Sequence, residues 1–184
     1  MSEAIPSSGQ LVKNRQYLPD APEETDNLTK YLTFNVADET FGANIEFIKE
    51  IIEHGRYTRI PLSQSNIRGV INLRGHVVPV VDMANRLGYE SQPITKRSCI
   101  IIVEIVDDSE IVNLGFVVDV VDEVIDLDNR CIEAAPSFGL DIRHDFIDGM
   151  GKLKSNEFVK LLDLNTVLSV KELSGVTENE TIDM

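Results

Sequence analysis

The sequence predicts an all-β protein built from two packed five-stranded barrels with only short helices. The first reason is an internal repeat: Gly69 stands 13 residues before Asp82, and Gly149 stands 14 residues before Asp163. The second is the density of short apolar segments separated by closely spaced turns. Closed barrels are favoured for such patterns because closure removes exposed strand edges.

The repeat extends further back along the chain. Glu50 follows Gly42 by eight residues, and Glu123 follows Gly115 by the same eight residues. The two copies span roughly residues 32–88 and 100–169. A folded body is therefore expected over residues 29–173, with a disordered tail over 1–28 and a disordered acidic tail over 174–184.

The 184 residues contain 42% hydrophobic side chains, which is enough for a substantial core. No apolar stretch approaches the roughly 20 residues of a membrane-spanning helix, and the N-terminus lacks the pattern of a secretory signal. We therefore expect a cytoplasmic protein without direct membrane insertion.

Strands are predicted first from alternation. Leu32, Phe34 and Val36 alternate with polar residues, which indicates a half-buried strand. A helical turn is expected over 45–49. The segments 67–73 and 76–81 should then form a hairpin around Arg74 and Gly75, where glycine provides the positive φ of a tight turn.

Pro79 lacks a backbone donor, so its strand is predicted to lie at a sheet edge or to be bulged there. Asp82 is placed to cap a short helix that ends at Leu87, and Asp163 to cap the matching helix through Leu168. A carboxylate belonging to a functional site is the alternative for both, but no second ligand type is placed beside them.

Residues 99–106 form a nearly continuous apolar run, interrupted only by Glu104. Such a run predicts a strand that is covered on both faces. A turn over 107–110 then returns the chain as a second strand over 111–121. These two strands are expected to open the second copy of the repeat.

The charge is strongly acidic and unevenly distributed. The net charge is −14, which disfavours nucleic-acid binding. Residues 49–97 contain eight Lys or Arg and four Asp or Glu, whereas residues 104–128 contain nine acidic residues and no basic one. The two halves are either ordinary solvated faces or opposite poles that meet complementary partners.

Motifs for catalysis are not found. The chain has no nucleophile elbow, phosphate-binding loop, dinucleotide glycine pattern or Cys-x-x-Cys pair. His54, His76 and His144 are scattered and are predicted as surface residues. Cys99 and Cys131 both adjoin apolar residues and are predicted as reduced, mostly buried thiols. Neither an enzyme nor a metal or cofactor site is expected.

The basic hairpin is the most distinctive surface feature. Strand alternation predicts that Arg68, Val70 and Asn72 share one face. Arg74 lies at the turn tip, where a guanidinium can reach the carboxylate or carbonyl of a partner. The second copy carries Asp148 at the position of Arg68. Arg74 is either a partner contact or an exposed residue that maintains solubility.

The segment IRGVINLRGHVVPVVDMANRLG, residues 67–88, resembles the signature of the CheW family of bacterial chemotaxis coupling proteins. The matching motifs are Arg68-Gly69, Asn72-Leu73-Arg74-Gly75 and Pro79-Val80-Val81-Asp82. Further matches lie at 47–51, 115–119, 133–136 and 149–164. The resemblance covers the whole predicted body.

This resemblance implies two intertwined SH3-like barrels related by a pseudo-twofold axis. It also implies a non-enzymatic adaptor that couples the cytoplasmic tips of chemoreceptors to the chemotaxis histidine kinase at membrane arrays, controlling flagellar motility. An adaptor of a non-flagellar array, such as one for twitching, is the alternative.

The resemblance further implies the binding residues. The kinase and receptor contacts implied are Ile48, Glu50, Arg68, Gly69, Asn72, Leu73, Arg74 and Gly75. Phe138 is implied as a second kinase contact, although Glu133 departs from the basic residue that some relatives carry nearby. Arg74 is expected either to touch a partner directly or to act as a strut that bonds backbone carbonyls.

Overall fold

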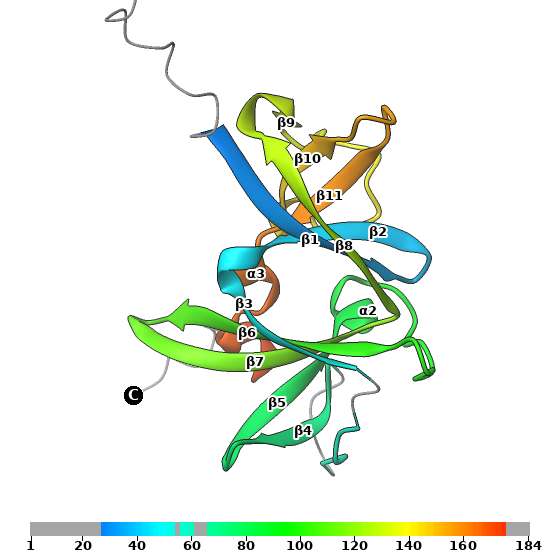
Figure 1. The fold of residues 1–184 in the computed structure, drawn as a ribbon. Coiled ribbons are helices and arrows are strands. Elements are labelled where there is room, and N and C mark those ends of the chain that lie inside the picture. Colours follow the sequence, from blue (N-terminus) through cyan, green and yellow to red (C-terminus); the bar gives the residue numbers. More distant parts are fainter. Residues whose placement is uncertain (1–26, 54–55, 61–65, 176–184) are drawn as a thin grey trace, which may run out of the picture.

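The computed structural model describes residues 27–53, 56–60 and 66–175, and it contains two β-sheets (Figure 1). The strands are β1 Leu28–Val36, β2 Glu39–Asn44, β3 Ile48–Glu53, β4 Ile67–Leu73, β5 His76–Asp82, β6 Cys99–Asp107, β7 Glu110–Val118, β8 Val120–Asp128, β9 Ile132–Glu133, β10 Ile147–Lys152 and β11 Phe158–Leu162. The short helices are η2 Ile45–Phe47, α2 Met83–Arg86, η3 Asn129–Cys131, η4 His144–Phe146, α3 Leu164–Val167 and α4 Val170–Leu173. The predicted all-β class is confirmed. No helix within the described ranges is long and apolar enough to cross a membrane.

The two sheets exchange strands. The six-stranded sheet runs β8-β1-β2-β11-β10-β9, and the five-stranded sheet runs β3-β6-β7-β5-β4. The first two strands of the chain therefore join the late strands β8 to β11, while the middle of the chain forms the other sheet. We call the five-stranded unit barrel 1 and the six-stranded unit barrel 2. This intertwined arrangement is the one implied by the family resemblance.

The repeat seen in the sequence corresponds to equivalent strand positions. Reading β3-β6-β7-β5-β4 against β8-β1-β2-β11-β10 gives the same order, with a parallel pair at the same place in each sheet. Gly42 and Gly115 occupy matching sites beside Leu161 and Ile100, whose side-chain carbons would lie 2.9 and 3.0 Å from an added Cβ. The sixth strand, β9, is only two residues long, and its counterpart in barrel 1 is the single bridge between Thr58 and Val70.

Three apolar clusters hold this arrangement together. A small cluster including Ile71, Val80 and Ile102 fills barrel 1, and one including Leu127 and Leu161 fills barrel 2. The largest cluster lies between the sheets and is built from residues of both. Strands that contribute one face to a barrel and the other to the central cluster must be apolar on both faces.

Strand β6 illustrates this requirement. Ile100 and Ile102 point into barrel 1, whereas Ile101 and Val103 point into the central cluster, and all four are at most 1% exposed. The predicted coverage of both faces is confirmed. The helix caps are also confirmed, since the Asp82 side chain accepts from the backbone N–H of Asn85, and the Asp163 side chain accepts from that of Thr166.

Several local predictions were wrong. Of the two alternatives predicted for Pro79, the sheet edge is wrong, because β5 lies between β7 and β4. A register shift does occur nearby, opposite Val80 and Val81, and Pro79 is tolerated because the parallel pairing of β5 with β7 begins only at Val80. Cys131 is exposed, not buried, because it ends the one-turn helix η3 on the surface. Strand β1 begins at Leu28, which is the last residue of the predicted tail. His54 lies outside the described residues, so its predicted surface position stays a prediction.

Candidate functional site

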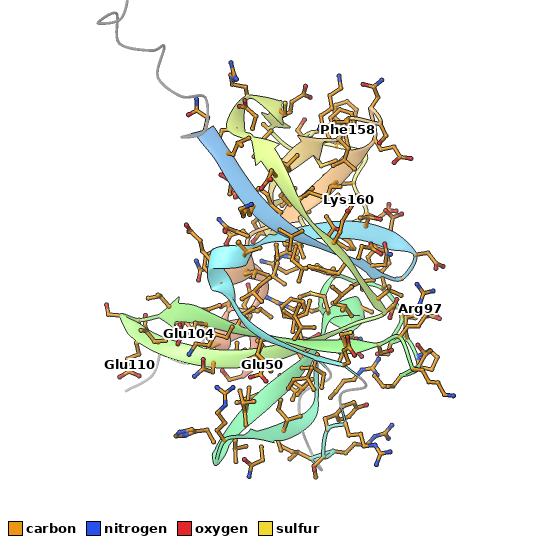
Figure 2. All side chains as sticks on the ribbon, in the orientation of Figure 1. Glu50, Arg97, Glu104, Glu110, Phe158 and Lys160 are labelled. Carbon is orange, nitrogen blue, oxygen red and sulfur yellow. The ribbon has the colours of Figure 1, made fainter. Side chains whose placement is uncertain are left out.

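The turn between β4 and β5 presents Arg74 to solvent beside Glu50 of β3, which is labelled in Figure 2. Arg74 and Gly75 have φ values of 51° and 85°, which is the pattern of a two-residue hairpin turn with both central residues left-handed. The Asn72 side chain stabilises the turn, because its Oδ1 accepts a hydrogen bond of 2.9 Å from the backbone N–H of Gly75. The Arg74 side chain is 81% exposed.

Glu50 on β3 lies next to this turn. Its Oε2 is 3.4 Å from Nη2 of Arg74, so two predicted site residues from different strands come together. An exposed pair of this length contributes at most about 1 kcal/mol to stability. Both side chains therefore remain available to a partner.

The apolar members of the predicted site have a different role. Ile48 is half-buried and packs against the central cluster between the sheets. Leu73 is half-buried and packs against the interior of barrel 1. These two residues hold the β3 strand and the β4–β5 turn in place beneath Glu50 and Arg74.

Arg68 is not a surface contact. Its side chain is only 12% exposed, and its Nε donates to Oδ2 of Asp82 at 2.9 Å while Nη2 donates to the carbonyl of Gln92. Burial acts to lower its pKa, but hydrogen bonds to Tyr57 and Asp82 outweigh this and raise the pKa of the Arg68 guanidinium. The strut role considered for Arg74 thus belongs to Arg68. The strand register shifts between Ile67 and Gly69, which interrupts the alternation assumed for Arg68.

Gly69 permits a close approach of two backbone segments. Thr58 and Val70 exchange two backbone hydrogen bonds of 2.8 Å beside it. A Cβ on Gly69 would lie 2.2 Å from the carbonyl oxygen of Thr58. Gly69 is therefore needed for the fold of barrel 1, where Thr58 pairs with the edge strand β4.

A groove separates the two barrels at their equivalent edge strands, β3 and β8. The cavity there has a volume of about 820 Å³. Its apolar lining residues are Ile51, Cys99, Val120 and Val121, and its charged ones are Glu53, Lys96, Arg97 and Asp122. Burial raises the pKa of the Cys99 thiol, so this sulfur is protonated at neutral pH. The sequence does not predict this groove, because its two walls lie about 70 residues apart in the chain and carry no shared motif.

Phe138 lies in the loop between β9 and η4. Its ring is 85% exposed, the largest exposed fraction among the large apolar side chains of the described residues. An aromatic ring this exposed gains substantially from burial against a partner. Its position is far along the chain from the β4–β5 turn, and it forms a separate candidate contact.

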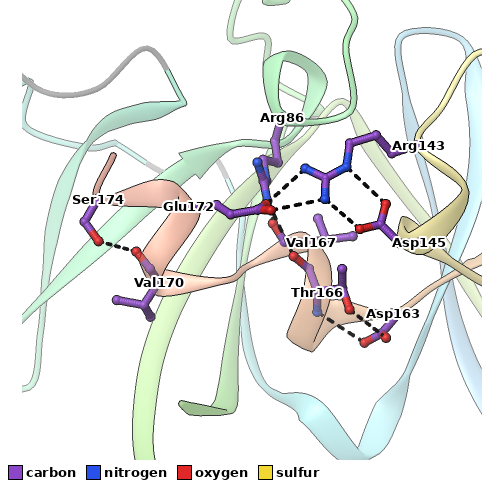
Figure 3. A network of polar contacts seen from close by, with 9 residues as sticks. All are labelled: Arg86, Arg143, Asp145, Asp163, Thr166, Val167, Val170, Glu172 and Ser174. Carbon is purple, nitrogen blue, oxygen red and sulfur yellow. Dashed lines mark hydrogen bonds and ion pairs between the residues drawn. The ribbon is translucent and has the colours of Figure 1, made fainter. Parts of the chain in front are cut away.

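A polar network joins both barrels to the C-terminal helix on another part of the surface (Figure 3). Arg86 of α2 donates to the carbonyl of Val167 at 2.6 Å and forms an ion pair with Glu172 of α4. Arg143 forms ion pairs with Glu172 at 3.1 Å and with Asp145 at 2.6 Å. Both guanidinium groups lie over the Phe146 ring, at 4.8 and 4.3 Å from its centre. Glu172 therefore ties α4 to a junction between the barrels.

We expect Glu172→Gln to remove a pH-dependent part of the stability. Hydrogen bonds from Arg143 and then Arg86 lower the pKa of Glu172 in the folded protein. A lowered folded pKa contributes stability above the unfolded value, and that contribution is lost as pH falls through the folded value. The difference in melting temperature between wild type and Glu172→Gln should thus be largest near neutral pH and vanish in acid.

The matched control for this measurement is Glu133→Gln, which alters an exposed carboxylate on β9 that has no ion pair within the described residues. Its melting temperature should follow that of the wild type at every pH. An equal pH dependence in both variants would show that Glu172 does not have the lowered pKa.

The described ranges contain no group of three or more His, Cys, Asp or Glu side chains placed to hold a metal ion. The two buried or capping aspartates, Asp82 and Asp163, are each occupied with backbone and side-chain donors.

A family model, curated relatives and a solved structure all point to one family. The family model of the CheW-like domain matches residues 30–172. The chemotaxis protein CheW of Rhizobium meliloti is 30% identical over 148 residues, covering 80% of this chain and 92% of that protein. The chemotaxis protein CheW of Bacillus subtilis is 32% identical over 139 residues, covering 76% and 86%. The crystal structure of the scaffolding protein TtCheW from Thermoanaerobacter tengcongensis superposes with a TM-score of 0.69 at 31% identity, covering 84% of this chain and 94% of that one.

Proposed function

The chain belongs to the family of CheW-like domains, and from this premise we propose that it is a non-enzymatic adaptor that couples chemoreceptors to the chemotaxis histidine kinase. Support comes from relatives that are named chemotaxis proteins and from a similar structure described as a scaffolding protein. The proposal places the protein in the cytoplasm, where it assembles with receptors at the membrane.

The kinase is proposed to dock on the surface of barrel 1 around Glu50 and Arg74. The single observation that carries this assignment is that Arg74 is 81% exposed yet held by a rigid turn. Because the turn fixes the backbone from which the Arg74 side chain projects, less conformational freedom is lost on binding a carboxylate or carbonyl than for an arginine on a mobile loop. Phe138 is proposed as the second kinase contact, an aromatic anchor of the kind that dominates interfaces.

The receptor tip is proposed to lie in the groove between β3 and β8. Its lining combines apolar with charged side chains, which is the composition expected for docking an amphipathic helix. The exposed side chains of Lys96 and Arg97 at the rim could set the register of the helix by pairing with its acidic residues.

We expect Arg74→Ala to give a folded adaptor that fails to stimulate the kinase. Among the described residues its only ion pair is the exposed one with Glu50, so stability should change by less than about 0.5 kcal/mol. Glu50→Lys should weaken kinase binding by reversing the neighbouring charge. Calorimetric titration of the kinase with each variant, combined with circular dichroism, measures both effects. A normal affinity for both variants would remove this surface from the interface.

The whole proposal is tested by reconstitution. Kinase phosphorylation should rise strongly only when receptor-containing membranes, kinase and this protein are all present. Stimulation without the protein, or none with it, would contradict the adaptor role. Deletion of the gene tests the output of the pathway. A flagellar output predicts loss of chemotactic swimming, whereas loss of twitching alone would contradict a flagellar output.

A further inference from the structure

The two barrels present similar charged faces. Glu50 of β3 and Arg74 of the β4–β5 turn form the face of barrel 1. Their equivalents in barrel 2 are Glu123, on the matching strand β8, and Lys154, which follows its matched glycine by the same five residues as Arg74. Glu123 and Lys154 line one hollow of about 880 Å³. A partner that recognised only a carboxylate and a nearby cation would not distinguish the two faces, so it needs a further feature to select barrel 1.

The β6–β7 hairpin provides a difference between the barrels, because it is longer than its counterpart, the β1–β2 hairpin. Beyond the pair that adjoins the matched glycines of β2 and β7, the β1–β2 hairpin has two further residue pairs before its turn, whereas the β6–β7 hairpin has four. The two additional pairs are Val106 with Ile111 and Asp107 with Glu110. In Figure 1 the β6–β7 hairpin extends past the start of β3.

The register places the first additional pair on the same sheet face as Glu50. Glu50 pairs directly with Ile102, and paired residues of an antiparallel ladder share a face. Since side chains alternate along a strand, Glu104 and Val106 follow Ile102 on that face. Ile111 joins them because it is the partner of Val106. Val106 lies about 14 Å along β6 from Ile102, at roughly 3.4 Å per residue. In Figure 2 the labelled Glu104 accordingly lies further out along the hairpin than Glu50.

The apolar pair is exposed on a hairpin that the protein supports from behind. Val106 and Ile111 are 63% and 69% exposed. On the opposite face of the hairpin, Ile105 is only 2% exposed. At the turn, the carboxylate of Asp108 lies 3.8 Å from Nζ of Lys171 on α4. Two adjacent branched side chains thus remain in water on a backed surface, and such a pair gains free energy when a partner covers it.

Charge gives this face of barrel 1 two unlike ends. The hairpin end carries Asp107, Asp108 and Glu110, and neither Asp107 nor Glu110 has an ion pair with another described residue. The other end carries the guanidinium of Arg74. A standard interface covers roughly 800 Å² on each partner, which is enough to include both ends. The acidic and basic ends therefore favour one orientation of a complementary partner.

We propose that Val106 and Ile111 form an apolar contact with the kinase, which extends the Glu50–Arg74 surface and directs the kinase to barrel 1. This inference rests on the proposed adaptor function. The receptor is not the occupant, because its proposed groove is lined by Ile51, which alternates with Glu50 and faces the other side of β3. The complementary kinase surface is apolar, with Lys or Arg beside the acidic hairpin tip and a carboxylate or carbonyl opposite Arg74.

Titration of the full chain with the purified kinase in a calorimeter tests the contact. The double variant Val106→Thr/Ile111→Thr keeps β-branched side chains and hence the hairpin, but its Kd should rise on the order of tenfold because less apolar area is buried. Val124→Thr on β8, where the valine is 53% exposed, is the matched control and should bind like the wild type. Arg74→Ala is titrated in parallel, because it tests the proposed kinase surface and leaves the hairpin intact.

Methyl NMR of the wild type separates a direct contact from an indirect effect of the substitutions. Saturation of the kinase protons in the complex should attenuate the methyl signals of Val106 and Ile111. The methyl signals of Val124 should keep their intensity, because this valine lies outside the proposed contact. Equal attenuation at all three residues, or none at Val106 and Ile111, would contradict a direct contact.

The titrations also separate this inference from the adaptor proposal. If Arg74→Ala binds the kinase weakly and the double variant binds like the wild type, the hairpin contact is overturned and the adaptor proposal stands. If the wild type does not bind the kinase, both are overturned. A double variant with an unchanged kinase Kd but weaker binding to receptor-containing vesicles, or weaker self-association in sedimentation, would assign the hairpin to another partner and would also overturn the inference.

Discussion

Arg68→Ala should destabilise the protein by about 3 kcal/mol, because removing one partner of a buried ion pair leaves the other uncompensated. The partner is Asp82, whose side chain is only 5% exposed. The substitution also removes the donor that satisfies the carbonyl of Gln92 and so releases the segment after α2. Asp82 would retain only its helix-cap bond and its bond to Ser91.

Urea denaturation of Arg68→Ala and Arg74→Ala measures this effect against a matched control in the same hairpin. The two variants lose the same side chain, but Arg74 is exposed and should leave the unfolding midpoint nearly unchanged. If Arg68→Ala does not fold, Arg68→Lys provides the measurement, since it keeps the charge and loses the planar fork that reaches both acceptors. Equal midpoints for the wild type and Arg68→Ala would show that the pair contributes no stability.

The sequence predicted the exposed position of Arg74 but not the buried position of Arg68. Alternation along the strand suggested a shared face for Arg68 and Asn72, but the register shift beside Gly69 breaks the alternation. The partners of Arg68 lie 14 and 24 residues further along, on a capping aspartate and in an irregular segment. No local pattern encodes that pairing. The motif therefore pointed to Arg68, but it did not predict that Arg68 forms a buried ion pair.

Local features were the ones that the sequence could predict. The β4–β5 turn and the two aspartate caps depend on residues within a few positions of one another. The repeat also revealed two equivalent units, since Glu50 and Glu123 do occupy matching edge strands, β3 and β8. Which strands join which sheet depends on long-range pairing, and the groove between β3 and β8 follows from that exchange. The exchange of strands between the two sheets was predicted from the family resemblance, because the periodicity of the sequence does not determine which strands pair.

The second large effect is expected at Gly69, where alanine should cost about 3 kcal/mol, the upper end of what overpacking usually costs. The added methyl group would lie 2.2 Å from the Thr58 oxygen and 2.8 Å from its carbonyl carbon. These are backbone atoms held by the paired hydrogen bonds between Thr58 and Val70, so they cannot move without breaking that bridge. Thr58 should therefore detach from the β4 edge.

Gly149 provides the matched comparison, because it occupies the equivalent position after the same register shift in barrel 2. There the nearest atom to an added Cβ is Cγ2 of Ile132 at 2.6 Å, and the nearest backbone atom, the Glu133 oxygen, is 3.2 Å away. A side chain can rotate aside, so Gly149→Ala should cost only about 1 kcal/mol. Hydrogen exchange at the amide of Val70 separates the two cases. It should accelerate in Gly69→Ala and stay protected in Gly149→Ala, because only the first substitution breaks the bridge that protects it. Equal destabilisation by the two substitutions, with Val70 protected in both, would show that the Thr58 bridge is not what requires glycine at position 69.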